Sequence, residues 1–184
     1  MARRRRAPIA ADGGGVAVDL PPEVRAVVQT LVTETIELLG PEPDDPLAAA
    51  LDTSPVARPH DPSLHRLLPD GYAADVDGGQ AASEFRRITD GDLRASKRAD
   101  AHRLLATITD TSLSLDDAEA WARALNDVRL VLGARLGLEA DGDAEERHDA
   151  AEAAGRVDPV LEIYELLGLL QTLLVDALDE IAPV

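Results

Sequence analysis

The feature of this 184-residue sequence that most limits its fold is an apolar stretch near the C-terminus that repeats with the period of an α-helix. Asp158 and Pro159 are typical of a helix start, as a cap and a first-turn proline. The apolar positions that follow step by three or four residues: Val160, Ile163, Leu167, Leu170, Leu174, Ala177 and Ile181, with Leu166, Leu169, Leu173 and Val175 widening that face. A helix that is apolar over most of its circumference is buried on more than one side. We therefore expect it either at the centre of a helical bundle or in the interface of a homodimer.

The rest of the chain also favours helices. Apolar residues make up 45% of the sequence and are nearly all Ala, Leu and Val, with one Phe, one Trp and two Tyr. Ala and Leu are strong helix formers, whereas aromatic residues favour strands. Apolar residues recur at helical spacing over residues 22–39, 77–108 and 115–136, and residues 89–91 (Thr-Asp-Gly) are predicted to split the second of these stretches. The predicted fold is mainly α, a bundle of about five to seven helices.

The N-terminal region has two interpretations. Residues 1–15 combine four arginines, Arg3 to Arg6, with three glycines, and they form either a short β-hairpin or a flexible basic tail. Residues 16–184 are predicted to be a single helical domain. Within it, residues 41–62 are a proline-rich loop with a short helical piece at residues 47–51, and residues 139–155 are an acidic, exposed segment.

The residues that support most catalytic and metal chemistry are missing. The sequence has no Cys, and its one Met is the first residue, so disulfides, thiolate chemistry and iron–sulfur clusters are excluded for these residues. The four His residues lack metal-site spacing, and neither a phosphate-binding glycine loop nor a serine-hydrolase motif is present. We therefore predict a protein that is not an enzyme and has no cofactor or metal. No stretch has the length of a membrane span or the pattern of a signal peptide, so a cytoplasmic location without membrane contact is expected.

Charge is unevenly distributed along the chain, whose net charge is −17. Residues 139–184 hold two basic and thirteen acidic residues. Basic residues gather instead between positions 86 and 103, where Arg86, Arg87, Arg94 and Arg98 are candidate contacts to phosphates or to an acidic protein surface. These arginines could instead pair with the acidic C-terminal helix or be solvated. Arg3 to Arg6 form a second, flexible candidate for phosphate contact.

A second group of candidates interrupts the helix predicted for residues 115–136. Asn126, Asp127 and Arg129 are polar residues within an otherwise apolar pattern, and Asn126 and Arg129 lie on one side of the helix. Polar groups in such a helix are hydrogen-bonded or exposed. They are predicted to form a structural network, for example from Arg129 to Glu84, or to line a pocket for a ligand or partner.

Several segments of the sequence together resemble a known family. They are residues 61–72, residues 84–89 with Lys97, Trp121, residues 125–133, Leu136 with Gly137, and Leu167 with Gly168 and Gln171. They are similar to an actinobacterial domain-of-unknown-function family that includes the AosR-type oxidative-stress transcriptional regulator, and the similarity covers nearly the whole chain after about residue 16. The resemblance implies a regulatory protein acting with RNA polymerase or a sigma factor. Members are also encoded beside the ClpS protease adaptor, which implies a link to proteolysis.

The sequence therefore predicts a non-enzymatic regulatory or interaction protein that docks on a protein partner through a helical surface. RNA polymerase and a sigma factor are the expected partners, and direct DNA binding is the first rival. An adaptor linked to Clp proteolysis and a small-molecule-binding protein are two further candidate functions. A thiol switch is excluded for these residues because none of them is Cys.

Overall fold

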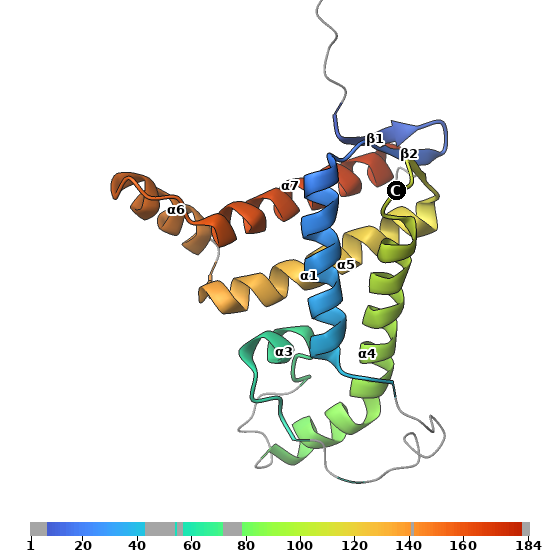
Figure 1. Cartoon of the computed structure of the whole chain (residues 1–184). Helices are drawn as coiled ribbons and strands as arrows, with labels where there is room; N and C mark the ends of the chain where they lie inside the picture. Colours follow the sequence, from blue (N-terminus) through green and yellow to red (C-terminus); the bar gives the residue numbers. More distant parts are fainter. Residues whose placement is uncertain (1–6, 43–53, 55–56, 72–78, 141, 182–184) are drawn as a thin grey trace, which may run out of the picture.

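The computed structural model describes residues 7–42, 54, 57–71, 79–140 and 142–181. Within these ranges the chain forms six helices and a small three-stranded sheet near the N-terminus, which confirms the predicted mainly α fold (Figure 1). The elements are β1 (Ile9–Asp12), β2 (Gly15–Val18), α1 (Pro22–Leu39), α3 (Pro62–Leu67), α4 (Gln80–Thr107), β3 (Ser112–Leu113), α5 (Leu115–Leu136), α6 (Asp143–Ala153) and α7 (Pro159–Ile181). None of these helices is long and apolar enough to cross a membrane.

The N-terminal hairpin is present, and a third strand completes it. Gly13 and Gly14 both have positive φ, at 61° and 108°, which the tight turn between β1 and β2 requires. β3 then pairs antiparallel with β2, so that Val16 lies opposite Leu113. The buried side chains of the sheet belong to the main hydrophobic core, and the hairpin is therefore part of the helical fold. The predicted arginine tail, Arg3 to Arg6, and the helical piece at residues 47–51 lie outside the described residues.

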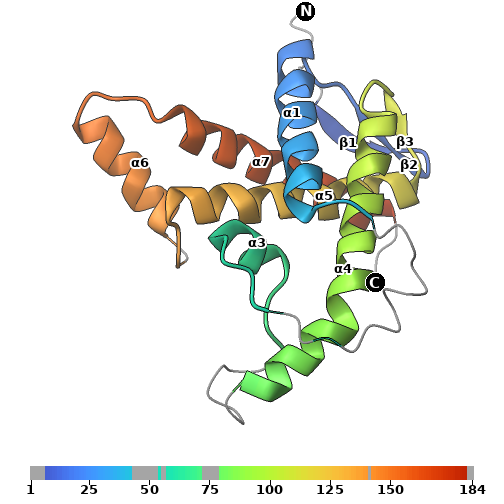
Figure 2. The same cartoon turned by 60° about the horizontal axis from the view of Figure 1, so that its bottom comes forward.

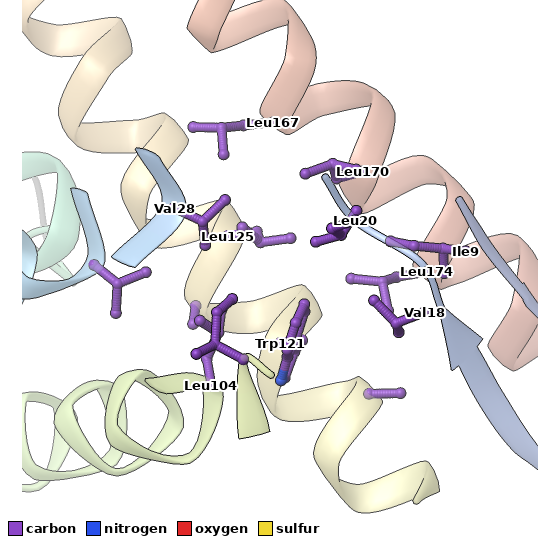
Figure 3. Packing of buried hydrophobic residues seen from close by; sticks show 14 of the residues in the cluster. Ile9, Val18, Leu20, Val28, Leu104, Trp121, Leu125, Leu167, Leu170 and Leu174 are labelled. Atoms are coloured by element: carbon purple, nitrogen blue, oxygen red, sulfur yellow. The ribbon is translucent and has the colours of Figure 1, made fainter. Parts of the chain in front are cut away.

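Helix α5 is the centre of the molecule. It packs against α1, α3, α4 and α7, and its N-terminal end also contacts the sheet (Figures 1 and 2). Trp121 of α5 is only 1% exposed, and its indole N–H donates to the hydroxyl of Thr107 over 2.8 Å. Figure 3 shows the Trp121 ring between Leu104 of α4 and the side chains of Val18 and Leu174. The single tryptophan therefore joins α4, α5, α7 and the sheet.

The ends of the helices follow the local signals in the sequence. Ser114 caps α5 by accepting from the backbone N–H of Asp117, and Gly137 ends the same helix in the left-handed conformation. Asp158 accepts from the N–H of Leu161 at the start of α7. The predicted starts at Pro22 and Pro159 are also confirmed. Short-range chemistry thus determines where α1, α5 and α7 begin and where α5 ends.

The predicted break at residues 89–91 was wrong, because α4 is one continuous helix through Gly91. Asp90 does not cap a new helix; it is 8% exposed and lies one turn from Arg86 on one side and from Arg94 on the other. Thr89 donates its hydroxyl proton back to the carbonyl of Phe85, as a residue inside a helix does. In both views the N-terminal part of α4 is bent relative to the rest (Figures 1 and 2). Burial of Asp90 between two arginines of the same helix thus accompanies a continuous helix where the local signal predicted a break.

Helix α6 differs from the other helices because it has no buried residue. It projects from the body of the molecule and joins the C-terminal end of α5 to the start of α7 (Figures 1 and 2). Asp143 accepts from the N–H groups of Glu139 and Ala140. Arg147 in the first half of α6 donates to the carbonyl of Leu136 at the end of α5 and forms an ion pair with Asp158 before α7, at 2.8 Å. The arm is therefore fixed by polar contacts at its base.

Candidate functional site

The basic residues of α4 lie beside the C-terminal end of α1. Arg94 donates to the carbonyl of Leu39 over 2.6 Å, and Arg98 donates to the carbonyl of Gly40 over 3.1 Å. The last turn of α1 contains no basic residue of its own. The carbonyls at a helix C-terminus lack partners within the helix and carry partial negative charge. Two arginines one turn apart on α4 satisfy these carbonyls, and burial lowers the pKa of Arg94 below its ordinary value.

Arg86 has a different partner, the loop that follows α3. Its guanidinium forms an ion pair and hydrogen bond with Asp70, whose carboxylate also lies 3.6 Å from Arg58 and 3.6 Å from His65. Burial alone would raise the pKa of Asp70, but the hydrogen bond and charge of Arg86, the contact with His65 and the charge of Arg58 bring it below its ordinary value. Arg86 thus joins the 69–71 loop to α4.

The four predicted arginines of α4 do not form one exposed basic face. Arg86 is 7% exposed and Arg98 is 4% exposed, so neither presents its charge to a large partner. Arg87 is half-buried and pairs with Glu84 one turn earlier, with its closer contact at 2.6 Å. The expected pairing of the arginines with the C-terminal helix also needs correction, because Arg86, Arg94 and Arg98 contact the end of α1 and Asp70.

The polar residues of α5 meet partners from α4 and α7. Lys97 donates to Asp127 over 2.6 Å, and both side chains are largely buried. Burial raises the pKa of the Asp127 carboxyl despite the hydrogen bond and the charge of Lys97. A buried ion pair of this kind fixes the register of two helices, while its desolvation cost offsets much of the attraction.

Arg129 belongs to a second network on the other side of α5. It donates to the side-chain oxygen of Gln171 over 2.8 Å and lies over the ring of Tyr164, 4.8 Å from its centroid. Gln171 in turn donates to Asn126 over 3.4 Å. The predicted contact between Arg129 and Glu84 was wrong, since Glu84 pairs with Arg87 and the partners of Arg129 come from α7. A structural network around Asn126 and Arg129 is nevertheless present.

A shallow cavity of about 370 Å³ lies where these networks approach the surface. It is lined by Leu93, Ser96, Lys97, Asp100, Ala122, Arg123, Asn126, Asp127 and Gln171. Its charged groups are paired within the chain, Lys97 with Asp127 and Arg123 with Asp100. The described residues contain no group of three His, Asp or Glu side chains that could hold a metal ion. The cavity brings together Asn126 and Asp127 of the predicted site, and its polar groups support the packing of α4, α5 and α7.

Comparison with protein families gives a match over most of the chain. The model of a domain of unknown function, DUF2017, matches residues 4–178. The chain belongs to the DUF2017 family. This confirms the resemblance noted in the sequence.

Mycobacterial proteins are among the curated relatives of the chain. A Mycobacterium tuberculosis protein named oxidative stress regulator AosR is 34% identical over 145 residues, which cover 68% of this chain and 66% of the relative. A Mycobacterium leprae protein named putative oxidative stress regulator AosR is 36% identical over 137 residues, or 66% of this chain and 60% of the relative. The matches thus span 60–66% of the length of these relatives, which is less than two thirds. No solved structure has a significant match.

Three glycines of this DUF2017 chain have a packing role that the sequence did not reveal. A Cβ on Gly71 would lie 2.7 Å from the ring of Phe85. A Cβ on Gly133 would lie 3.3 Å from the guanidinium of Arg66, and one on Gly168 would lie 3.3 Å from that of Arg129. Each glycine therefore leaves room for a large side chain from another element. A glycine inside a helical pattern, as at positions 133 and 168, was the available signal.

The sequence also missed the partners of the candidate residues. Asp70 and Tyr164 were not predicted as site residues, although both contact a predicted arginine. Their separation in sequence from Arg86 and Arg129 explains the omission, because spacing rules apply within one helix only. The carbonyls of Leu39 and Gly40 are backbone groups and leave no mark in a side-chain pattern.

Proposed function

We propose that this DUF2017 protein is a stress-linked regulator that acts without catalysis, by docking on another protein. The expected partner is a component of the transcription apparatus, either RNA polymerase or a sigma factor. The names of its relatives support the regulatory role, since proteins 34–36% identical to this chain are called oxidative stress regulators. The share of their length that is matched is 66% or less, so their role is carried over here as a proposal.

The observation that carries the docking mode is the internal use of the candidate reactive groups. Arg94 and Arg98 bind the end of α1, and Lys97 binds Asp127. Groups used in this way stabilise the packing of helices and are not available for a substrate or a phosphate. The outer surface of the helices is then the part of the molecule left for recognition.

Direct DNA binding receives less support from the charge distribution. The chain has a net charge of −17, and a field of this sign repels nucleic acid unless a local basic patch defeats it. Two of the four candidate arginines in α4 are buried. The 184 residues also lack Cys, so a response to oxidants would not use a thiol of this chain.

Biolayer interferometry with purified components tests the proposal. The full chain is immobilised, and the cognate RNA polymerase core, individual sigma factors and a promoter DNA fragment are applied separately. We expect binding to the polymerase or to one sigma factor, and no binding to the DNA fragment alone. Binding to DNA alone that weakens steeply with salt would contradict the proposal. The absence of binding to every transcription component would also contradict it.

A further inference from the structure

A short apolar strip runs along α7 at the edge of its core face. Leu169 is 54% exposed, and the half-buried Leu166 and Leu173 lie three residues before it and four residues after it. Steps of three and four place side chains in one line along a helix, as at the a and d positions of a coiled coil. The neighbouring face of α7 packs against α5 and the first two strands through the buried Leu167, Leu170 and Leu174. Leu166 and Leu173 also pack against the main hydrophobic core, so the strip lies along the edge of the core face and Leu169 is its exposed part.

The same line of positions continues into acidic residues at both ends. Glu162 lies four residues before Leu166, Asp176 lies three residues after Leu173, and Glu180 lies four residues after Asp176. These six positions, which we call the α7 seam, are Glu162, Leu166, Leu169, Leu173, Asp176 and Glu180. The three acids are exposed, and among the residues that the structure describes no basic side chain forms an ion pair with them. Glu165 beside the seam is different, because it lies 3.2 Å from His148 of α6.

This distribution of charge selects the kind of partner. A second copy of the chain would place one α7 seam against another, and acids would then face acids at both ends in an antiparallel pair and in a parallel pair. Like charges at such positions oppose association. A partner helix with an apolar centre and basic residues at both ends would instead cover Leu169 and neutralise the acids. Residues 139–184 contain two basic and thirteen acidic residues, so the surroundings also attract a basic segment.

We propose that the α7 seam is the docking site for a basic amphipathic helix of the partner protein. The proposal rests on the regulatory docking function above and assigns it a surface. It assigns this surface to a partner protein in place of the homodimer that the wide apolar face of the C-terminal helix suggested. The part of the seam that the fold leaves open to a partner is Leu169, which is 54% exposed, together with the three exposed acids.

Site-specific photo-crosslinking in oxidatively stressed cells tests the proposal. Leu169 is replaced by p-benzoylphenylalanine in the full chain, and a matched chain carries the same group at the exposed Thr33 of α1. We expect position 169 to cross-link to a protein segment with apolar residues at steps of three and four and Lys or Arg at its ends. A cross-link to a second copy of the chain, or no cross-link at position 169, would overturn the proposal.

Charge reversal with the partner so identified completes the test. The variant Asp176→Lys/Glu180→Lys should weaken binding at least about tenfold, while the control Glu37→Lys/Asp92→Lys, which changes exposed acids on α1 and α4, should keep wild-type affinity. Equal losses in both variants would show a general effect of net charge and overturn the assignment of the seam. Polymerase or sigma binding that persists in the seam variant would leave the regulatory function intact and place its surface elsewhere.

Discussion

Helices α4 and α7 each carry a row of charged residues, and the two rows have opposite surroundings. Arg86 of α4 contacts Asp70, Arg94 and Arg98 contact the end of α1, and Arg98 is only 4% exposed. The acids of the α7 seam are exposed, with an apolar strip between them. Buried charges that find partners hold a fold together, whereas exposed charges around an apolar strip are typical of a recognition surface. Burial of each residue, more than its charge, separates the two roles.

The largest expected difference in the free energy of unfolding is between Ala variants of two neighbouring leucines on α7. Leu170 is 2% exposed and Leu169 is 54% exposed, so the same change to Ala removes core packing at one position and surface contact at the other. Leu170→Ala should lower the free energy of unfolding by about 3 kcal/mol, and Leu169→Ala by about 0.5 kcal/mol or less. Urea denaturation followed by Trp121 fluorescence measures both. Equal losses would mean that the seam is part of the core.

The next largest difference in the free energy of unfolding is expected between Ala variants of two arginines on α4. Arg98→Ala removes the donor to the Gly40 carbonyl and leaves a gap in the interior, which should cost about 2–3 kcal/mol of unfolding free energy. Arg87→Ala breaks a pair with the exposed Glu84 within the helix and should change the free energy of unfolding much less. Thermal unfolding by circular dichroism compares the two variants. A stable Arg98→Ala chain that no longer binds its partner would return α4 to the role of a docking face.

The continuity of α4 can be tested at Gly91. A Cβ at this position meets open space, and the residue lies within the helix. Gly91→Ala should therefore raise the free energy of unfolding by about 0.5–1 kcal/mol, because Ala is the better helix former. If the helix breaks at this point instead, the substitution will leave stability unchanged or lower it. The same urea titration decides between these outcomes.

Two carboxylates of α5 should contribute to folding stability with opposite dependences on pH. Burial raises the pKa of Asp127 above its ordinary value of 3.8, so its favourable contribution is present below that value and is lost as pH rises through the folded pKa. Hydrogen bonds from Ser114 and Arg103 lower the pKa of Asp117, so its contribution is present above 3.8 and is lost as pH falls through the folded pKa.

The Asn variants separate these two effects. Between about pH 3 and pH 7, Asp127→Asn should gain stability relative to wild type as pH rises, and Asp117→Asn should lose it. Urea midpoints measured at several pH values give both trends. The same trend in both variants would mean that Asp127 is not desolvated in the folded protein.

The sequence predicted the features that depend on nearby residues, namely helix ends, core faces and the hairpin turn. Ser114, Gly137 and Pro159 fixed the ends of α5 and the start of α7, and the spacing of apolar residues identified the core faces. The turn glycines predicted the hairpin as one of two options. Leu113, by contrast, is the single apolar residue of a two-residue strand, too little for a pattern to detect.

Contacts between distant parts of the chain were not predictable in this way. Arg94 bonds to the backbone of Leu39, which is 55 residues away, and Arg129 bonds to Gln171 at a separation of 42 residues. A row of arginines looks the same in sequence whether a helix end or solvent lies opposite. The apolar strip of the seam was likewise merged with the core face of the last helix, because Leu169 and Leu170 are adjacent in sequence although one is exposed and the other buried.

Hydrogen exchange followed by mass spectrometry tests the contrast between α4 and α7 most directly. The full chain is labelled alone and in complex with the transcription protein that it binds. We predict slower exchange on binding in peptides from α7, Pro159–Ile181, with no change in peptides from α4, Gln80–Thr107. Slower exchange in α4 with unchanged exchange in α7 would contradict the account.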